Sequence, residues 1–178
     1  MSLANALRIL EMRQTKGKSP IQFHYIVPAR ISAGKMRLLL TSLFKVHGKR
    51  PSAVNYVFCS DKYLLKINQE YLNHDTLTDI ITFDLSDSPL EVVADIYISV
   101  ERVRENATGL GISFSAELRR VIIHGALHLV GFKDKTRTER ARIRAAEDNY
   151  LSLFESTNVP RETKAKKKFH VKHGKRVS

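Results

Sequence analysis

Residues 92–134 read VVADIYISVERVRENATGLGISFSAELRRVIIHGALHLVGFKD, and this stretch decides the fold. Its first eight residues, which end at Ser99, are rich in Val, Ile and Tyr and predict a strand. Ser99 can cap a charged helix that runs to about Gly109. A second helix is predicted from near Ser115 to Gly131, because its apolar residues recur at helical spacing. A strand that leads into two such helices indicates a domain in which helices cover a sheet.

The sequence on either side supplies the other elements of one domain. We predict further strands at 21–27, 54–58 and 79–85, and further helices at 33–46, after Ser60 and from Thr136 to about Phe154. Thr136 and Glu139 have the spacing of a capping box for the last of these helices. The predicted fold class is therefore α+β, a single domain with a four-stranded mixed sheet and about five helices. That domain spans residues 20–158, between an N-terminal extension (1–19) and a basic tail (159–178).

The composition excludes several classes of protein. Hydrophobic residues make up 43% of the 178 residues, which is enough for a packed core, so wholesale disorder is excluded. The one cysteine, Cys59, excludes a disulfide framework or a multi-cysteine metal site, and we expect it to be a buried apolar residue rather than a nucleophile. No apolar run approaches the ~20 residues of a membrane span, and charges interrupt residues 1–14. We therefore expect a cytoplasmic protein without membrane contact.

The positive charge predicts a polyanionic partner. The chain has a formal net charge of +12, of which residues 161–178 carry +7 from eight Lys or Arg and one Glu. Few apolar residues separate these cations, so we interpret the tail as a disordered arm that binds phosphates, with Lys166, Lys167 and Lys168 as RNA contacts. A tail that only increases solubility is the alternative. Nucleic acid is the first partner to consider for such a chain.

Two histidines near the end of the second helix carry the chemistry. His124 and His128 are four residues apart, so their rings project from one helix face and can chelate one transition ion. Gly131 allows a left-handed turn, after which Asp134 can return a carboxylate to the same point. Three protein ligands leave a position open for water, which is typical of a catalytic ion. The alternative is that both histidines are ordinary polar residues that face the interior.

The residues near this pair of histidines limit the types of reaction that the site can catalyse. Metalloproteases with a similar spacing carry Glu directly after the first histidine as the general base, but this chain has Gly125 there. Peptide hydrolysis by that route is therefore disfavoured. Glu117 lies seven residues before His124 on the same helix face and can act behind the site. We favour the other interpretation, that it is an acid placed in the first turn to suit the helix dipole.

Three blocks of sequence match one known family. The matching residues are His124, Gly125, Leu127, His128, Leu129, Gly131 and Phe132 in one block, Asn68, Tyr71, Asp75, Thr78, Asp79 and Phe83 in another, and Asp95, Ile96, Ile98 and Ser99 in a third. In these residues the sequence resembles the YbeY family of bacterial metal-dependent endoribonucleases and ribosomal RNA maturation factors. The resemblance covers residues 54–154 and leaves out residues 1–19 and the basic tail.

The resemblance implies a function and a set of site residues. It implies one Zn²⁺ held by His124, His128 and Asp134, cleavage of single-stranded RNA, and a role in 16S ribosomal RNA 3′-end maturation and ribosome quality control. The partner is then the ribosomal RNA of the small ribosomal subunit. Ala94 replaces a glycine of the family pattern, and two further departures matter: Asp134 replaces the usual third histidine, and Leu72 falls where the family has an arginine. We expect His74 to substitute for that arginine, and we assign catalysis to His124, His128 and His74.

Several assignments stay open at the level of sequence. Arg119 and Arg120 are candidate RNA-phosphate contacts, as is Arg102, although solvated helix faces explain these arginines equally well. Two rival functions also remain. One is a non-catalytic ribosome-assembly factor in which the ion only fixes the fold. The other is a metallohydrolase of another substrate class, such as a peptide or a small amide.

Overall fold

The computed structural model describes residues 19–156, so residues 1–18 of the predicted extension and the predicted basic tail, with Lys166, Lys167 and Lys168, lie outside the described residues. The elements, in chain order, are β1 (Ile21–Tyr25), α2 (Ala33–Val46), β2 (Arg50–Cys59), α3 (Asp61–Ile67), the π-helical turn η1 (Asn68–Leu72), β3 (Ile80–Asp84), β4 (Glu91–Ser99), α4 (Val100–Leu110), α5 (Phe114–Leu129) and α6 (Arg137–Ser156). The predicted α+β class, with a four-stranded mixed sheet and five α-helices in this range, is confirmed. No helix between residues 19 and 156 is both long and apolar enough to cross a membrane.

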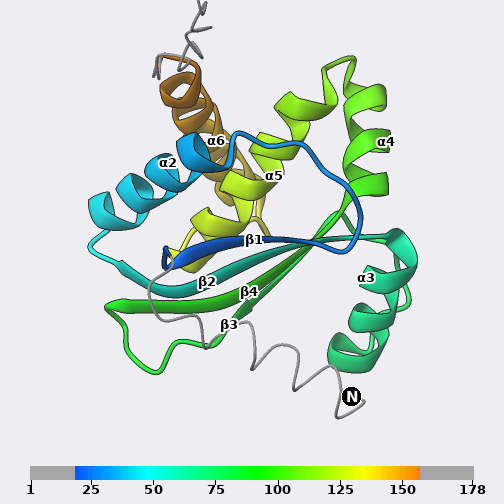
Figure 1. Cartoon of the computed structure of the whole chain (residues 1–178), viewed down its shortest axis with the longest axis horizontal. Coiled ribbons are helices and arrows are strands. Elements are labelled where there is room, and N and C mark those ends of the chain that lie inside the picture. Colours follow the sequence, from blue (N-terminus) through cyan, green and yellow to red (C-terminus); the bar gives the residue numbers. More distant parts are fainter. Residues whose placement is uncertain (1–18, 157–178) are drawn as a thin grey trace, which may run out of the picture.

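The sheet has the strand order β1-β2-β4-β3 (Figure 1). β1, β2 and β4 run parallel, with Ile21 opposite Val54 and Asn55 opposite Asp95. Parallel neighbours need a crossover connection, which α2 provides between β1 and β2. β3 runs antiparallel to β4 at the edge of the sheet, and a short loop is enough to join this pair.

Apolar residues of the central strands pack on both faces of the sheet. Tyr56 and Phe58 of β2 belong to the main core, which includes the inward sides of α2, α5 and α6. Figure 1 shows these three helices together on one side of the sheet. Because side chains alternate along a strand, Val57 and Cys59 of β2 point the other way, where they pack with Leu64 of α3. Burial on both faces is typical of parallel central strands.

Side-chain caps determine where several helices begin. Ser60 and Ser99 each accept a hydrogen bond from a backbone N–H group in the first turn of α3 and α4, as predicted. Thr136 and Glu139 bond reciprocally to each other's backbone N–H groups, at 2.8 and 3.2 Å, so the predicted capping box is confirmed. These contacts are local in sequence, which is why the pattern of residues predicts them well.

The predicted start of β2 was wrong by four residues. β2 begins at Arg50 rather than at residue 54, because Arg50 pairs with Glu91 at the start of β4 beyond an irregularity in the register. Pairing with a distant strand has no signature in the local apolar pattern. α5 begins at Phe114, where the Ser113 side chain caps it, in agreement with the predicted start near Ser115.

The cysteine is buried, as predicted. Cys59 has no exposed surface. Burial, together with the nearby charges of Asp61 and Glu101, raises the pKa of its thiol to about 12. The thiolate is the nucleophilic form, so Cys59 is inert near neutral pH.

A glycine on α5 sets the distance between that helix and the sheet. A Cβ added at Gly125 would lie 2.9 Å from Ile80 Cδ1 and 3.2 Å from Ile96 Cγ2, which belong to β3 and β4. Both distances are shorter than an ordinary van der Waals contact. The buried hydroxyl of Tyr56 adds a polar tie, because it donates to the backbone carbonyl oxygen of Ile122 at 3.2 Å. These contacts position the helix that carries the two predicted histidine ligands.

Substitution of Gly125 by Ala tests this close approach. Alanine favours a helix over glycine by ~1 kcal/mol, but overpacking a core costs ~1–3 kcal/mol, so we expect the free energy of unfolding to fall by up to about 2 kcal/mol. Gly109→Ala on α4 is the matched control, because no described atom beyond its chain neighbours and its own helix backbone lies within 4 Å of the added Cβ. That variant should be as stable as the parent or up to ~1 kcal/mol more stable. Urea unfolding measures the stability of both variants. Equal stabilisation by the two substitutions would contradict the role of Gly125.

Candidate metal centre

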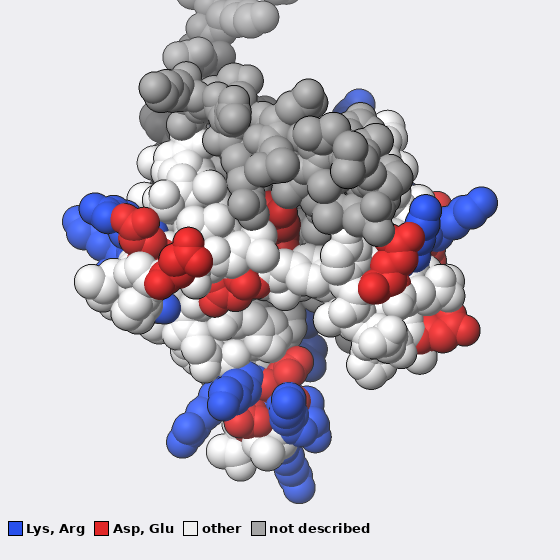
Figure 2. Space-filling view, turned by 90° about the horizontal axis from the view of Figure 1, so that it is seen from below, with Lys and Arg blue, Asp and Glu red and all other residues white. Residues whose placement is uncertain are grey.

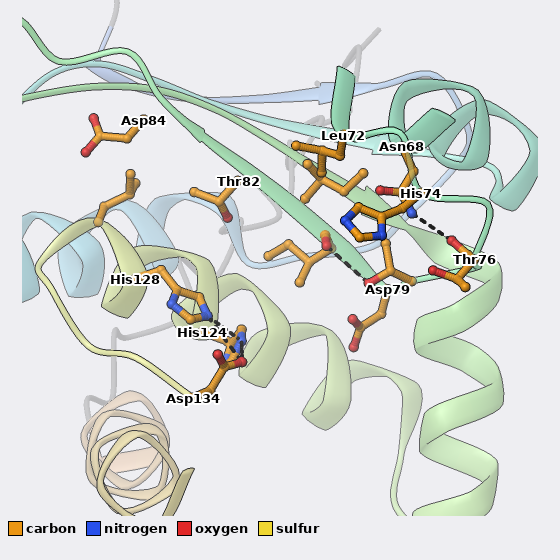
Figure 3. Close-up of a pocket in the computed structure, with 14 residues that line it drawn as sticks. Asn68, Leu72, His74, Thr76, Asp79, Thr82, Asp84, His124, His128 and Asp134 are labelled. Carbon is orange, nitrogen blue, oxygen red and sulfur yellow. Dashed lines mark hydrogen bonds and ion pairs between the residues drawn. The ribbon is translucent and has the colours of Figure 1, made fainter. Parts of the chain in front are cut away.

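The three predicted metal ligands lie together at the C-terminal end of α5. The Nε2 atoms of His124 and His128 are 2.9 Å apart, and Asp134 Oδ2 lies 3.9 Å from the first and 3.7 Å from the second. Figure 3 shows these three side chains close together beside a pocket. The histidine side chains are partly buried, at 21% and 29% exposed, and that of Asp134 is 47% exposed. Two nitrogens and one oxygen thus converge at a point that solvent can reach.

The other nitrogen of each histidine ring contacts an acceptor. His124 Nδ1 lies 2.7 Å from Glu147 Oε1, and His128 Nδ1 lies 3.0 Å from the backbone carbonyl oxygen of Phe132. A carboxylate and a carbonyl can only accept, so each Nδ1 must donate its hydrogen. In a neutral ring the lone pair then belongs to Nε2, the atom that faces the other histidine. Two lone pairs 2.9 Å apart repel each other unless a proton or a metal cation lies between them.

This donor set fits a divalent metal ion. The three ligand atoms lie within 4.8 Å of one another, and neutral imidazole nitrogens and a carboxylate oxygen are ordinary zinc ligands. A hydrogen bond from Nδ1 to a carboxylate or a carbonyl is also the usual support of a metal-bound histidine. A four-coordinate ion with three protein ligands keeps one position for water or substrate. The alternative of two ordinary interior histidines needs a proton shared between the two Nε2 atoms, and it gives no role to the Asp134 carboxylate beside them.

A glycine turn brings Asp134 back to the histidines. Gly131 has a φ of +100°, which glycine adopts easily, and the N–H of Phe132 donates to the carbonyl oxygen of Leu127 at 3.0 Å. The predicted left-handed turn after α5 is thereby confirmed. Further along, Arg140 Nη1 donates to the carbonyl oxygen of Asp134 at 3.1 Å and to that of the next residue at 2.8 Å. This contact ties the loop that carries Asp134 to the start of α6.

A buried row of charged side chains lies behind His124. Glu147 of α6 also accepts from Arg120 of α5 at 3.3 Å, and Arg120 donates to Glu117 at 2.8 Å. Glu147 and Glu117 are almost completely buried. Burial by itself raises the pKa of Glu147, but the hydrogen bond with His124 and the charges of His124 and Arg120 lower it below its usual value. Glu147 therefore stays an acceptor-only carboxylate beside His124.

Glu147 is a residue of the site that the sequence did not predict. This residue lies 23 positions after His124 on a different helix, and no spacing rule connects the two. Its position among apolar residues on the inward side of α6 was the one available signal. Glu117 is in the first turn of α5, as the favoured interpretation predicts. It also lies behind the metal centre, because Arg120 pairs with both Glu117 and Glu147, and Glu147 contacts His124.

The metal centre forms one part of a pocket of about 620 Å³. β3 supplies another part of its lining, and His74 and Leu72 come from η1 and the residues that follow it. Figure 3 shows His74 on the side of the pocket away from His124 and His128. Asn68 holds this segment, because its buried Nδ2 donates to a backbone carbonyl oxygen in the same loop at 2.8 Å. The fold thus places His74, and the position where the family has an arginine, in the same pocket as the ligands.

The arginines predicted as phosphate contacts have carboxylate partners. Arg119 pairs with Glu155 at 2.8 Å, and Arg102 pairs with Asp61 at 2.9 Å. Arg120 is held between the two buried glutamates described above. The side chains of these three arginines are 21–29% exposed, so they are not on freely solvated helix faces. Their contact with RNA stays a prediction.

Substitution of Glu147 by Ala tests its support of His124. Removing the carboxylate frees the His124 ring and leaves its Nδ1–H without an acceptor, so we expect Zn²⁺ affinity to fall by about 10–100-fold. Glu155→Ala is the matched control, because it removes an exposed carboxylate from the same helix. Competition with a chromophoric chelator measures the affinity, and circular dichroism checks the fold. Zn²⁺ affinity equal to that of the parent in the folded Glu147→Ala variant would show that the contact has no such role.

Comparison with known proteins identifies the family. Residues 27–155 match a family model described as endoribonuclease YbeY. The endoribonuclease YbeY of Flavobacterium psychrophilum is 51% identical over 115 residues, which cover 65% of this chain and 81% of that protein. The same-named proteins of Porphyromonas gingivalis and Cytophaga hutchinsonii are 48% identical over 111 residues and 45% identical over 119 residues. These matches cover 62% and 67% of this chain, and 73% and 83% of the respective relatives.

A solved structure shares the fold. The solution structure of TM1509 from Thermotoga maritima is 25% identical in sequence and aligns with a TM-score of 0.51, covering 76% of this chain and 93% of that chain. The family match extends from the residues before α2 to the last turn of α6, and so includes the whole candidate metal centre. On the family model and these relatives together, the chain belongs to the YbeY endoribonuclease family.

Proposed function

We propose that this chain is a metal-dependent endoribonuclease that cleaves single-stranded RNA. The observation that carries the proposal is the pair of Nε2 lone pairs that face each other beside Asp134 at the side of a pocket. Membership of the YbeY family, whose relatives bear the name endoribonuclease, supports RNA as the substrate. We assign the ion as one Zn²⁺, held by His124, His128 and Asp134.

The side chains of the pocket have separate roles in this proposal. A bound divalent ion supplies Lewis acidity and a water that ionises near neutral pH. His124 and His128 present their Nε2 atoms, and Glu147 and the Phe132 carbonyl keep both rings in that orientation. His74 is exposed at another part of the pocket and, when protonated, can bind a phosphate or transfer a proton.

The absence of a base at residue 125 supports a substrate other than a peptide. Metalloproteases place their general-base glutamate directly after the first histidine. Here Gly125 faces β3 and β4, and a Cβ at that position would already contact the Ile80 side chain at 2.9 Å. A larger side chain there requires the Ile80 side chain or α5 to shift, so protease-type catalysis lacks the residue and has little room for it.

The cellular role follows from the same family. We propose that the chain acts in the cytoplasm on the ribosomal RNA of the small ribosomal subunit, in 16S 3′-end maturation and ribosome quality control. The family to which the chain belongs supports this role, and so does the net charge of +12, which suits a polyanionic partner.

Substitution of His128 by Ala tests the metal-dependent reaction. Loss of one ligand should remove bound metal and lower cleavage of single-stranded RNA by at least about 100-fold, since even a residue behind a ligand costs about 10–100-fold. Chelator should have the same effect on the parent. His24→Ala on β1 is the control, because it makes the same change in a residue that does not line the pocket. Elemental analysis and a gel-based cleavage assay under nuclease-free conditions measure the two quantities.

Each rival function predicts a different result for these proteins. Undiminished RNA cleavage by His128→Ala would show that the metal centre is not catalytic. Unfolding of His128→Ala, with no RNA cleavage by the parent, would favour an assembly factor with a structural ion. Cleavage of a casein-type substrate by the parent, without cleavage of RNA, would favour a hydrolase of another class.

Substitution of His74 by Ala tests its assigned role. We expect kcat/KM for RNA cleavage to fall by about 100-fold, the lower end of the range for a residue that transfers a proton or stabilises charge. Zn²⁺ content should stay at the parent level, because His74 is not among the grouped ligands. His74→Arg should recover part of the activity, since it restores the cation of the family pattern. An unchanged kcat/KM in His74→Ala would remove His74 from the mechanism.

A further inference from the structure

The positive charge of the described residues is concentrated beside the candidate metal centre. Residues 19–156 contain 18 Lys or Arg and 16 Asp or Glu, a net charge of +2. Residues 133–144 alone contain six Lys or Arg and two acids, a net charge of +4, so the rest of this range is net negative. Figure 2 accordingly shows Lys and Arg in separate clusters, with acids among them, rather than one continuous positive face.

The cations of residues 133–144 include a row along one side of α6. All six cations of this segment are exposed. Arg137, Arg140 and Arg144 are spaced three and four residues apart, so they lie on the same side of the helix and form what we call the α6 row. Arg140 connects this row to the metal centre, because its Nη1 donates to the carbonyl oxygen of Asp134 at 3.1 Å.

The α6 row has no carboxylate partner within the described residues. Arg119 and Arg120 on α5 form ion pairs with glutamates, whereas none of the three arginines of the α6 row does so between residues 19 and 156. The row also opposes helix stability. Like charges three or four residues apart repel, and cations near a helix N-terminus oppose the helix dipole. Arg140 holds the Asp134 loop, but no such contact within the described residues explains Arg137 and Arg144.

We infer that the α6 row binds phosphates of single-stranded RNA next to the site of cleavage. The inference rests on the proposed function, because it takes the metal centre as the position of the scissile phosphate. Guanidinium groups bind phosphate oxygens with paired hydrogen bonds, and exposed ones keep their donors available. Since the row extends along α6 from beside Asp134, it contacts phosphates next to the scissile one in the strand. We therefore assign phosphate contact to these arginines, which have no carboxylate partner among the described residues, rather than to Arg119 and Arg120.

The test compares two double variants that lose the same charge. One is Arg137→Gln with Arg144→Gln in the α6 row. The other, the control, is Arg142→Gln with Lys45→Gln, which changes an exposed arginine on a different side of α6 and an exposed lysine of α2. Both variants keep the residues of the metal centre and the contact of Arg140 with the Asp134 loop.

RNA binding is measured by fluorescence anisotropy at several salt concentrations with the metal-loaded full chain. The probe is a labelled single-stranded RNA with 2′-O-methyl groups, checked on a gel to remain intact. Each phosphate contact with a single strand contributes ~0.7 to the slope of log affinity against log salt, so the row variant should lose about 1.4 from that slope. Its binding at 0.1 M salt should then be about 25-fold weaker. The control variant should keep the parent slope.

The outcomes separate this inference from the proposed function. Arg137→Lys with Arg144→Lys keeps the charge and should keep the slope, and thermal stability of the Gln variant should equal or exceed that of the parent. Equal slopes for the row variant and the control, no RNA binding by the parent, or unfolding of the row variant would each overturn the inference. Binding through the row by a chain that does not cleave RNA would support the inference and contradict the proposed function.

Discussion

The close approach of two histidine nitrogens is the interaction on which the candidate site depends. His124 and His128 each use Nδ1 as a donor, to Glu147 and to the Phe132 carbonyl, so their Nε2 lone pairs face each other at 2.9 Å. A shared cation turns that repulsion into attraction, and Asp134 brings an oxygen to the same point. The arrangement requires α5, the turn after it and α6 to keep fixed relative positions.

The scaffold meets this requirement by close packing and by buried charge. Gly125 lets α5 lie directly on β3 and β4, and the Tyr56 hydroxyl holds the same helix from the sheet. Glu147 reaches His124 from α6, and its partner Arg120 keeps that buried carboxylate charged. Buried charges of this kind are costly unless each is paired, and here each has a partner. The packing that positions the histidines also leaves little room for a protease-type base at residue 125.

Charge in this protein is divided by position rather than spread over the surface. The sequence predicts that arginines of α4 and α5 contact RNA. In the structure these arginines form ion pairs with carboxylates of the same domain. Residues 133–144 carry exposed cations without such partners, next to the loop that holds Asp134. The net charge of the chain therefore indicates a class of partner. Whether each guanidinium already pairs with a carboxylate decides which arginines are available to bind that partner.

Local pattern alone determined the fold class, the Thr136–Glu139 capping box and the His124, His128 and Asp134 grouping. The capping box and the ligand grouping depend on residues within about three helical turns of one another, where spacing dictates which side chains meet, and the fold class depends on the periodicity within each element. Only the tertiary structure decided that β2 extends back to Arg50. It alone also placed Glu147 against His124, which is 23 residues away, and put His74 into the pocket. Such contacts join separate elements. Which residues meet depends on how the helices pack on the sheet, and the periodicity of the sequence carries no information about that packing.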